Sequence, residues 1–118
     1  MKGLNEAMIE NAKITSVDLS MADHGVLTLQ MTIEGKGWGC VLGGYVLGKG
    51  YLGAKEFDGS PKGIEEIMRI MDVVGVERFN DMVGKYIRVE SERWGSKIHK
   101  FGNIVEDKWF DYKEFYGS

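Results

Sequence analysis

The stretch from Tyr86 to Asn103 gathers side chains that could bind a small anion bearing an aromatic group. They are Arg88, Arg93, Trp94, Lys97, His99 and Asn103. Arginine and lysine pair with phosphates, aromatic and guanidinium planes stack on a base, and asparagine can hydrogen bond to a base edge. The pattern therefore indicates a nucleotide site. It is also typical of a solvated hairpin whose cations balance Glu90 and Glu92, and both interpretations stay open.

A glycine-dense stretch, Gly35 to Gly53, holds eight of the 17 glycines. Glycine costs folding entropy and has no side chain to pack, so such a cluster indicates turns, bulges or the close approach of another surface. We predict a bulge or contact point at Gly43 and Gly44, where a ligand or a second protomer comes close. Tyr45 follows directly and belongs to the predicted ligand site.

Two phosphate-binding motifs match this stretch by spacing only. The segment GGYVLGK, Gly43 to Lys49, fits a P-loop up to its lysine, but Gly50 stands where the motif needs Ser or Thr, and no helix is expected there. The segment GKGYLG, Gly48 to Gly53, fits the dinucleotide fingerprint, yet it does not open a helix either. We therefore predict neither a P-loop nor a dinucleotide-binding fold.

Residues for catalysis or metal binding do not form a recognisable set. His24 and His99 have no Cys, Asp or Glu at a metal-ligand spacing. Nothing singles out a nucleophilic triad, and no two carboxylates form an obvious acid–base pair. We expect a binding protein rather than an enzyme, without a metal or a cofactor.

The composition predicts one soluble domain over residues 1–118, since 43% of the residues are hydrophobic and 28% are charged. A net charge of −3 argues against binding DNA, which needs a basic footprint. No apolar stretch approaches the roughly 20 residues of a membrane span, and Met1–Glu10 lacks the apolar run of a signal peptide. Cys40 is the only cysteine, which fits a reducing cytosol. We expect a cytoplasmic protein.

Alternating polar and apolar residues predict the strands that position these side chains. The strands are Ala12–Leu19, Val26–Glu34, Cys40–Leu47, Lys85–Ser91 and Lys97–Ile104. The second is the clearest, because every other residue from Leu27 to Ile33 is apolar. Asp23-His24-Gly25 supplies a hairpin turn before it. The aromatic C-terminal segment is expected to form a short strand or turn at the sheet edge.

One helix has clear start and stop signals. Ser60 is its predicted N-cap, Pro61 its first residue and Gly75 its stop. Its apolar face is predicted to consist of Ile64, Ile67, Met68, Met71 and Val74. Val76–Val83 adds a short second helix. The fold class is therefore α+β, a mostly antiparallel sheet of about five to six strands packed with one main helix and a short second helix.

Segments spread over nearly the whole chain carry a resemblance to a known family, although no single one is diagnostic of a chemistry. They are Asn11–Ile14, Asp23–Thr28, Gly43–Tyr45, Val74–Glu77, Gly84–Val89, Trp94–Lys97, Gly102–Ile104 and Asp107–Phe110. In these segments the chain resembles short phage and prophage proteins of the first-described family of Thoeris anti-defence sponges. The resemblance implies an α+β homodimer, with hexamers as a further assembly, in the cytoplasm of an infected bacterium.

The function implied by this resemblance is sequestration of a cyclic nucleotide immune signal without cleavage. The ligand would be the glyco-cyclic ADP-ribose made by TIR-domain enzymes, and some members also hold cyclic trinucleotides, which extends the effect to CBASS defence. The family's functional positions do not align here motif by motif, so the predicted site residues come from this sequence alone. Two alternatives remain, a protein-interaction inhibitor of a host defence nuclease and a small nucleotide hydrolase.

Overall fold

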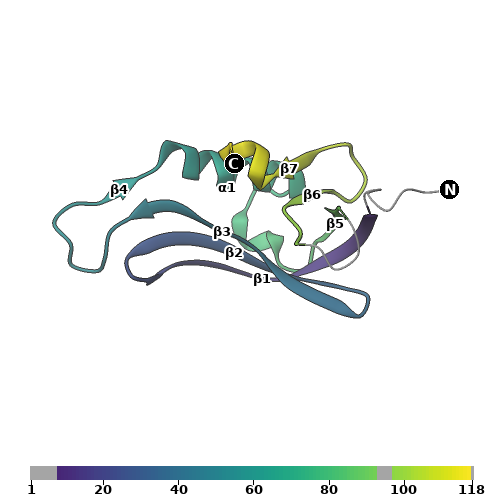
Figure 1. The fold of residues 1–118 in the computed structure, drawn as a ribbon, viewed down its shortest axis with the longest axis horizontal. Helices are drawn as coiled ribbons and strands as arrows, with labels where there is room; N and C mark the ends of the chain where they lie inside the picture. Colours follow the sequence, from purple (N-terminus) through teal and green to yellow (C-terminus); the bar gives the residue numbers. More distant parts are fainter. Residues whose placement is uncertain (1–7, 93–96, 118) are drawn as a thin grey trace.

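An antiparallel sheet is the framework of the computed structural model, which describes residues 8–92 and 97–117. Its strands within these residues are β1 (Met8–Asp23), β2 (Val26–Gly35), β3 (Trp38–Lys49), β4 (Asp58–Gly59), β5 (Tyr86–Ser91), β6 (Lys100–Asn103) and β7 (Trp109–Asp111). They lie in the order β4-β3-β2-β1-β5-β6-β7. The helices are α1 (Pro61–Val74), η1 (Phe79–Met82) and α2 (Tyr112–Tyr116). In Figure 1 the long strands β1 to β3 form a curved layer, and α1 and α2 lie on one side of it.

This architecture confirms the predicted α+β class with one main helix and a short second helix. The described residues contain seven strands: β7, of three residues at the sheet edge, is the short strand or turn expected of the C-terminal segment, and β4, of two residues, is the strand that the sequence did not indicate. Strands this short are too brief to show an alternation in the sequence. The predicted second helix is the 3₁₀ helix η1, where Met82 is fully buried. Sequence reasoning missed α2, which follows β7 directly.

The β1–β2 hairpin confirms the first two predicted strands and the turn between them. β1 extends beyond the predicted Ala12–Leu19 in both directions. His24 and Gly25 have φ angles of 54° and 75°, the left-handed pair that a tight hairpin turn requires. Alternate residues of β2 from Leu29 to Ile33 are fully buried, as their periodicity predicts.

β3 carries the bulge predicted at Gly43 and Gly44. Their φ angles are 97° and 88°, and the β2–β3 register is interrupted between Thr28 and Gln30. A Cβ on Gly43 would lie 2.3 Å from the carbonyl oxygen of Leu29, so the surface that approaches this glycine is the neighbouring strand. β3 continues beyond the bulge as a strand, so no helix begins there. This agrees with the sequence-based conclusion that the segment is not a P-loop.

α1 begins and ends where the sequence predicts. The Ser60 hydroxyl accepts a hydrogen bond from the Gly63 N–H at 3.1 Å, and Pro61 is the first helical residue. Gly75 closes the helix in the left-handed conformation, with a φ of 89°, and its N–H donates to the Met71 carbonyl at 2.8 Å.

The face of α1 that packs on the sheet differs from the predicted one. Ile64 and Met68 are 59% and 66% exposed, whereas Glu66 is fully buried. Of the five residues predicted to form the apolar face, only Val74 is buried. Gly63 accounts for this rotation, because a Cβ there would lie 2.7 Å from the backbone of β3. Only a glycine lets the helix approach the strand so closely. Glu66, three residues further on, shares the face that Gly63 turns toward β3.

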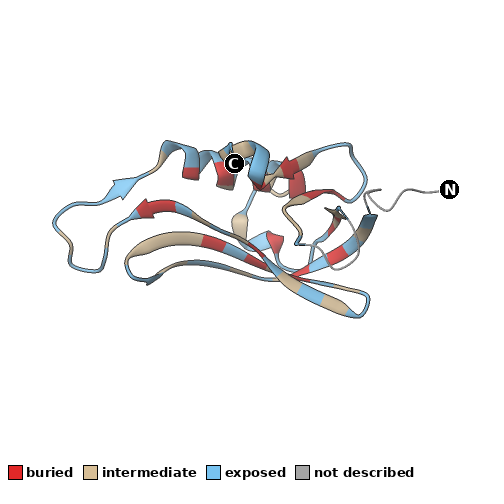
Figure 2. Cartoon of the chain, in the orientation of Figure 1, coloured by how far each residue is buried: buried red, intermediate tan, exposed pale blue. Residues whose placement is uncertain are grey.

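One hydrophobic core lies between the sheet and the helices. Figure 2 shows buried residues on the underside of α1, on β6 and β7, and along the facing parts of the long strands. The molecule is elongated, with principal extents of 59 × 29 × 25 Å, because the ends of the long hairpins project beyond the helices. Within the described residues, no helix has the length and apolar character needed to span a bilayer.

Candidate functional site

Five of the predicted site residues line one pocket. Gly43, Gly44 and Tyr45 come from β3, and Lys97 and His99 come from the segment before β6. We name this cavity, of about 280 Å³, the bulge pocket; its lining is Val41, Gly43, Gly44, Tyr45, Lys97, Ile98, His99 and Tyr112. Three strands separate β3 from β6 in the sheet order, so the two meet only because the sheet curls.

The segment Lys97–His99 is not a strand, contrary to the prediction, because β6 begins at Lys100. Contacts to the C-terminal segment hold it instead. The Tyr112 N–H donates to the His99 carbonyl at 2.9 Å, and His99 Nδ1 lies 3.1 Å from Asp111 Oδ1. The side chain of His99 is thereby fixed at the wall of the bulge pocket.

The lining of the bulge pocket carries potential cations and no carboxylate. Lys97 is exposed and forms no ion pair with a described residue. Partial burial raises the pKa of Asp111, but hydrogen bonds from the Glu114 N–H and from His99 outweigh this effect and hold the pKa below its usual value. Asp111 is therefore a carboxylate partner for His99, although it does not itself line the bulge pocket. Glu92 Oε1 also lies 3.9 Å from His99 Nε2, so Lys97 is the lining cation that makes the cavity favour an anion over a cation.

Aromatic rings form the floor of the bulge pocket. The ring of Tyr45 lies parallel to those of Tyr112 and Tyr116, with centroids 5.2 and 4.7 Å away. Tyr112 also packs edge-on against Phe110 at 4.9 Å. Because Tyr45 belongs to β3 and the other tyrosines to α2, the stack joins the bulge to the C-terminal helix.

Two buried polar atoms beneath this stack have no hydrogen-bond partner among the described residues. They are the Tyr112 hydroxyl and Oε2 of Glu66. The other oxygen of Glu66 accepts a short hydrogen bond from the Tyr116 hydroxyl. Burial raises the pKa of Glu66 and that hydrogen bond lowers it, with a net rise, while burial raises the pKa of Tyr112 well above its usual value. Tyr112 lines the pocket but is only 1% exposed, so a polar ligand group could satisfy its hydroxyl only after the pocket opens locally.

Arg88 and Asn103 do not line the bulge pocket, and each has a structural partner. The Arg88 Nε donates to the Asn103 carbonyl at 2.7 Å, Nη2 donates to the Glu106 carbonyl at 2.8 Å, and the guanidinium stacks over Trp109. The Asn103 side chain donates to the Val73 carbonyl at 2.9 Å and accepts from two amides of the following turn. These contacts tie the β6–β7 turn to the end of α1. Arg93 and Trp94 lie outside the described residues.

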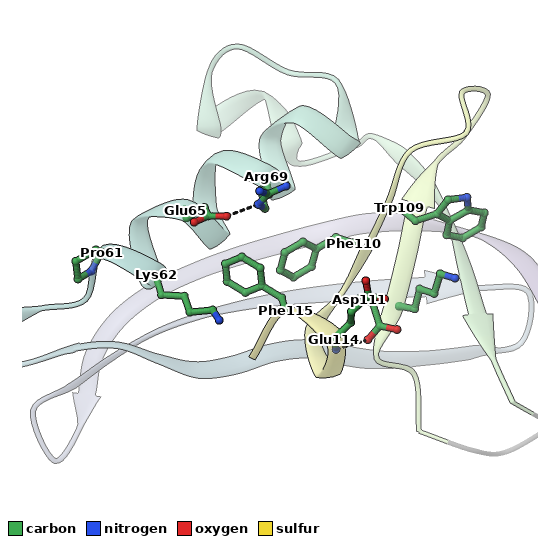
Figure 3. A pocket seen from close by; sticks show the side chains of 10 residues that line it. Pro61, Lys62, Glu65, Arg69, Trp109, Phe110, Asp111, Glu114 and Phe115 are labelled. Carbon is green, nitrogen blue, oxygen red and sulfur yellow. Dashed lines mark hydrogen bonds and ion pairs between the residues drawn. The ribbon is translucent and has the colours of Figure 1, made fainter. Parts of the chain in front are cut away.

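A second and larger cavity lies between the start of α1 and the β7–α2 segment. We name it the helix groove; it has a volume of about 730 Å³ and is lined by Pro61, Lys62, Glu65, Arg69, Lys100, Trp109, Phe110, Asp111, Glu114 and Phe115. Figure 3 shows the Lys62, Glu65 and Arg69 side chains extending from α1, with the Phe110 and Phe115 rings facing them. The Lys62 ammonium lies 4.9 Å from the Phe115 centroid.

Carboxylates balance the cations of the helix groove. Arg69 pairs with Glu65 at 2.5 Å, and Lys100 pairs with Glu90 at 3.4 Å. Glu114 and Asp111 add further negative charge to the lining. Sequence reasoning did not find this groove. The signal was present in the one-face spacing of its three charged α1 residues and in the aromatic run at the C-terminus.

Comparison with known proteins identifies no relative of this chain. Searches against protein-family models, curated proteins and solved structures find no match for the chain. Among the described residues, no group of three or more His, Cys, Asp and Glu side chains could hold a metal ion. The bulge pocket, which five of the predicted site residues line, is the starting point for a functional proposal.

Proposed function

We propose that this protein binds a small, doubly anionic cyclic nucleotide in the bulge pocket and sequesters it intact. One observation carries the proposal: residues selected from two distant parts of the sequence line a single cavity free of carboxylates. The resemblance of the sequence to Thoeris anti-defence sponges supplies the ligand, glyco-cyclic ADP-ribose. The protein would act in the cytoplasm of an infected bacterium and block Thoeris signalling.

The chemistry of the lining suits such a ligand. Lys97 and His99 can pair with the phosphates, and the backbone at Gly44 is open to close approach because a Cβ there would meet only the Gln30 side chain. The unpaired Tyr112 hydroxyl can bond a ribose or base atom. A volume of about 280 Å³ lies just under the roughly 300–1,000 Å³ of ligand-burying clefts, so part of the nucleotide stays outside this chain.

Calorimetric titration tests the proposal directly. We would titrate separately glyco-cyclic ADP-ribose, cyclic ADP-ribose, linear ADP-ribose and a cyclic trinucleotide. Bound ligand is then released by heat denaturation of the protein, and its mass is measured by mass spectrometry. We expect tight binding of a cyclic species and recovery at its original mass. A hydrolysed product would favour the nucleotide hydrolase instead. Absent nucleotide binding together with a stable complex with a host nuclease would favour the interaction inhibitor.

A charge reversal in each cavity locates the site. Lys97→Glu in the bulge pocket should weaken binding by at least about tenfold, which corresponds to roughly 1.4 kcal/mol. Lys62→Glu in the helix groove is the matched control, since it makes the same charge change at another exposed lysine, and it should leave affinity within about threefold. The opposite ranking would place the ligand in the helix groove and overturn the site.

A further inference from the structure

β7 is the last strand of the sheet, so within the described residues its outer edge has no neighbouring strand. Trp109 and Phe110 point to opposite faces of this strand, and both line the helix groove. Figure 3 shows the Phe110 ring on the side nearer α1 and the Trp109 indole on the far side. The groove therefore includes the free edge of β7 between them.

The hydrogen bonds at the two ends of β7 show which of its backbone groups face β6. At one end the Asn103 N–H donates to the Lys108 carbonyl at 2.9 Å, and at the other the Tyr112 N–H donates to the His99 carbonyl at 2.9 Å. Backbone groups alternate in direction along an antiparallel strand. Every second residue from Lys108 to Tyr112 therefore turns its N–H and C=O toward β6.

The residues between these positions, Trp109 and Asp111, direct their N–H and C=O groups away from β6 and toward the groove. They pair with Gly102 and Lys100 in a register without a shift, so the alternation holds along the whole strand. The Asp111 carbonyl is engaged, because an N-cap residue accepts the first hydrogen bond of its helix. No backbone bond from a described turn or loop reaches the Trp109 N–H, the Trp109 carbonyl or the Asp111 N–H.

The rest of the groove has the form of a ligand cleft. α1 lies across from β7, and the rings of Phe110 and Phe115 lie between them with their centroids 5.2 Å apart. The volume of about 730 Å³ falls within the roughly 300–1,000 Å³ of clefts that bury a ligand. A strand edge beside a helix and an aromatic floor can hold an extended peptide.

The charges of the lining favour a peptide over a nucleotide as the occupant. Basic and acidic side chains are equal in number, and they are Lys62, Arg69, Lys100, Glu65, Asp111 and Glu114. This balance gives a polyanion little net attraction. A peptide backbone is neutral and carries alternating donors and acceptors, so it complements both the balanced charge and the free groups of β7.

We propose that the helix groove binds an extended peptide segment of a partner protein, which adds to the sheet antiparallel to β7. The peptide residue opposite Trp109 exchanges both backbone hydrogen bonds with it, and another peptide carbonyl accepts from the Asp111 N–H. The peptide residue opposite Phe110 shares its face, so an apolar side chain there packs on Phe110 and Phe115. This site shares no lining residue with the bulge pocket and goes beyond nucleotide binding.

Selection from a peptide library tests the site. A random library of acetylated, amidated hexapeptides is passed over the immobilised full-length chain, and the retained peptides are sequenced by mass spectrometry. We expect enriched peptides with an apolar residue at one fixed position. Phe115→Ala should lower their affinity at least about fivefold, whereas Phe57→Ala, the same change at an exposed residue outside the groove, should leave it within about twofold. No enrichment, or equal losses in both variants, would overturn the proposal.

Single N-methylation of an enriched peptide tests strand addition without altering the protein. An N-methyl group removes a backbone donor and obstructs pairing at that position. Amides that face β7 alternate with amides that face away, so affinity should fall at least about tenfold at every second central amide and stay within about threefold at the others. Uniform losses, or none, would show that the peptide does not bind as a strand.

Hydrogen exchange of the wild-type chain locates the pairing on the protein. In ¹⁵N-labelled protein the enriched peptide should slow exchange of the Trp109 and Asp111 amides, which are free before binding. The Phe110 amide, which already faces β6, should exchange at an unchanged rate relative to global unfolding. Unchanged exchange at both Trp109 and Asp111 would overturn the proposal even if the peptide binds. Circular dichroism verifies the folding of Phe115→Ala, and the two experiments on the wild-type chain do not depend on it.

Discussion

The bulge pocket and the helix groove both combine cations with aromatic rings, but they treat charge in different ways. The larger groove places Glu65, Asp111 and Glu114 in the same lining as its cations. The smaller pocket has Lys97 and His99 in its lining and no carboxylate. The difference makes the smaller pocket the better candidate for an anion, because no acidic side chain in its lining offsets the cations.

The largest expected effect comes from breaking the backbone of the bulge pocket. Gly43→Val puts a branched side chain at a φ of 97°, with its Cβ 2.3 Å from the Leu29 carbonyl oxygen. We expect the free energy of unfolding to fall by about 3 kcal/mol or more, measured by urea denaturation.

Gly44→Val is the control for the bulge, because a Cβ there would lie 3.5 Å from Gln30 Nε2. It has the φ strain without the backbone clash, so a loss of about 1–2 kcal/mol is expected. Equal losses at both glycines would show that strain alone, rather than the contact with β2, fixes the bulge.

The next largest loss of stability is expected at Asp111, which lies between the bulge pocket and the helix groove. Its side chain caps α2 by accepting from the Glu114 N–H at 3.2 Å and also bonds His99. Asp111→Ala should cost about 1 kcal/mol of stability near neutral pH. Because the folded-state pKa is lowered, this contribution is present above the usual pKa of aspartate and is lost as pH falls through the folded value. Denaturation of both proteins over an acidic pH series should show their stabilities converging.

Beneath the bulge pocket, Glu66 should make stability depend on pH in the opposite direction. Its raised pKa means that the folded chain holds the proton more tightly than the unfolded chain. The resulting stabilisation is complete below the usual pKa of glutamate and is lost as pH rises through the folded value. Glu66→Gln should therefore match wild type in acid and gain on it as pH rises. Thermal melts of both proteins over the same pH series check this expectation.

The smallest change in stability is expected at Tyr112, yet it separates ligand binding from folding most clearly. Tyr112→Phe removes only a buried hydroxyl that has no partner among the described residues. The free energy of unfolding should stay within about 0.5 kcal/mol of wild type or rise, since an unpaired buried polar group costs free energy. Nucleotide affinity should fall several-fold in the same titrations. Unchanged affinity would show that the ligand does not reach the pocket floor.

The fold was predictable from sequence where the signals are local. The Ser60–Pro61 start, the Gly75 stop and the alternation of β2 depend on neighbouring residues, and all three are confirmed. The rotation of α1 about its axis could not be predicted from sequence, because it depends on how closely Gly63 approaches a distant strand. An apolar stripe that includes Ile64 is compatible with more than one rotation, and periodicity alone does not choose between them.

The candidate site was predictable only in part, for a related reason. The glycine bulge and the basic segment each gave a local signal, but only the curl of the sheet brings Gly44 and Lys97 to one cavity. Arg88 and Asn103 looked like ligand groups because their carbonyl partners are 15 or more residues away in the chain. Pattern and composition do not reveal backbone acceptors at such separations.

The parallel tyrosine rings have an optical consequence. Tyr45 lies within 5.2 Å of both Tyr112 and Tyr116, close enough for their ultraviolet transitions to couple in an asymmetric environment. Such coupling gives a near-ultraviolet circular dichroism signal that depends on β3 and α2 being docked together. Separation of the bulge from α2 would therefore change the tyrosine dichroism while the far-ultraviolet spectrum of the sheet stays unchanged. The state of the pocket can thus be followed without an added probe.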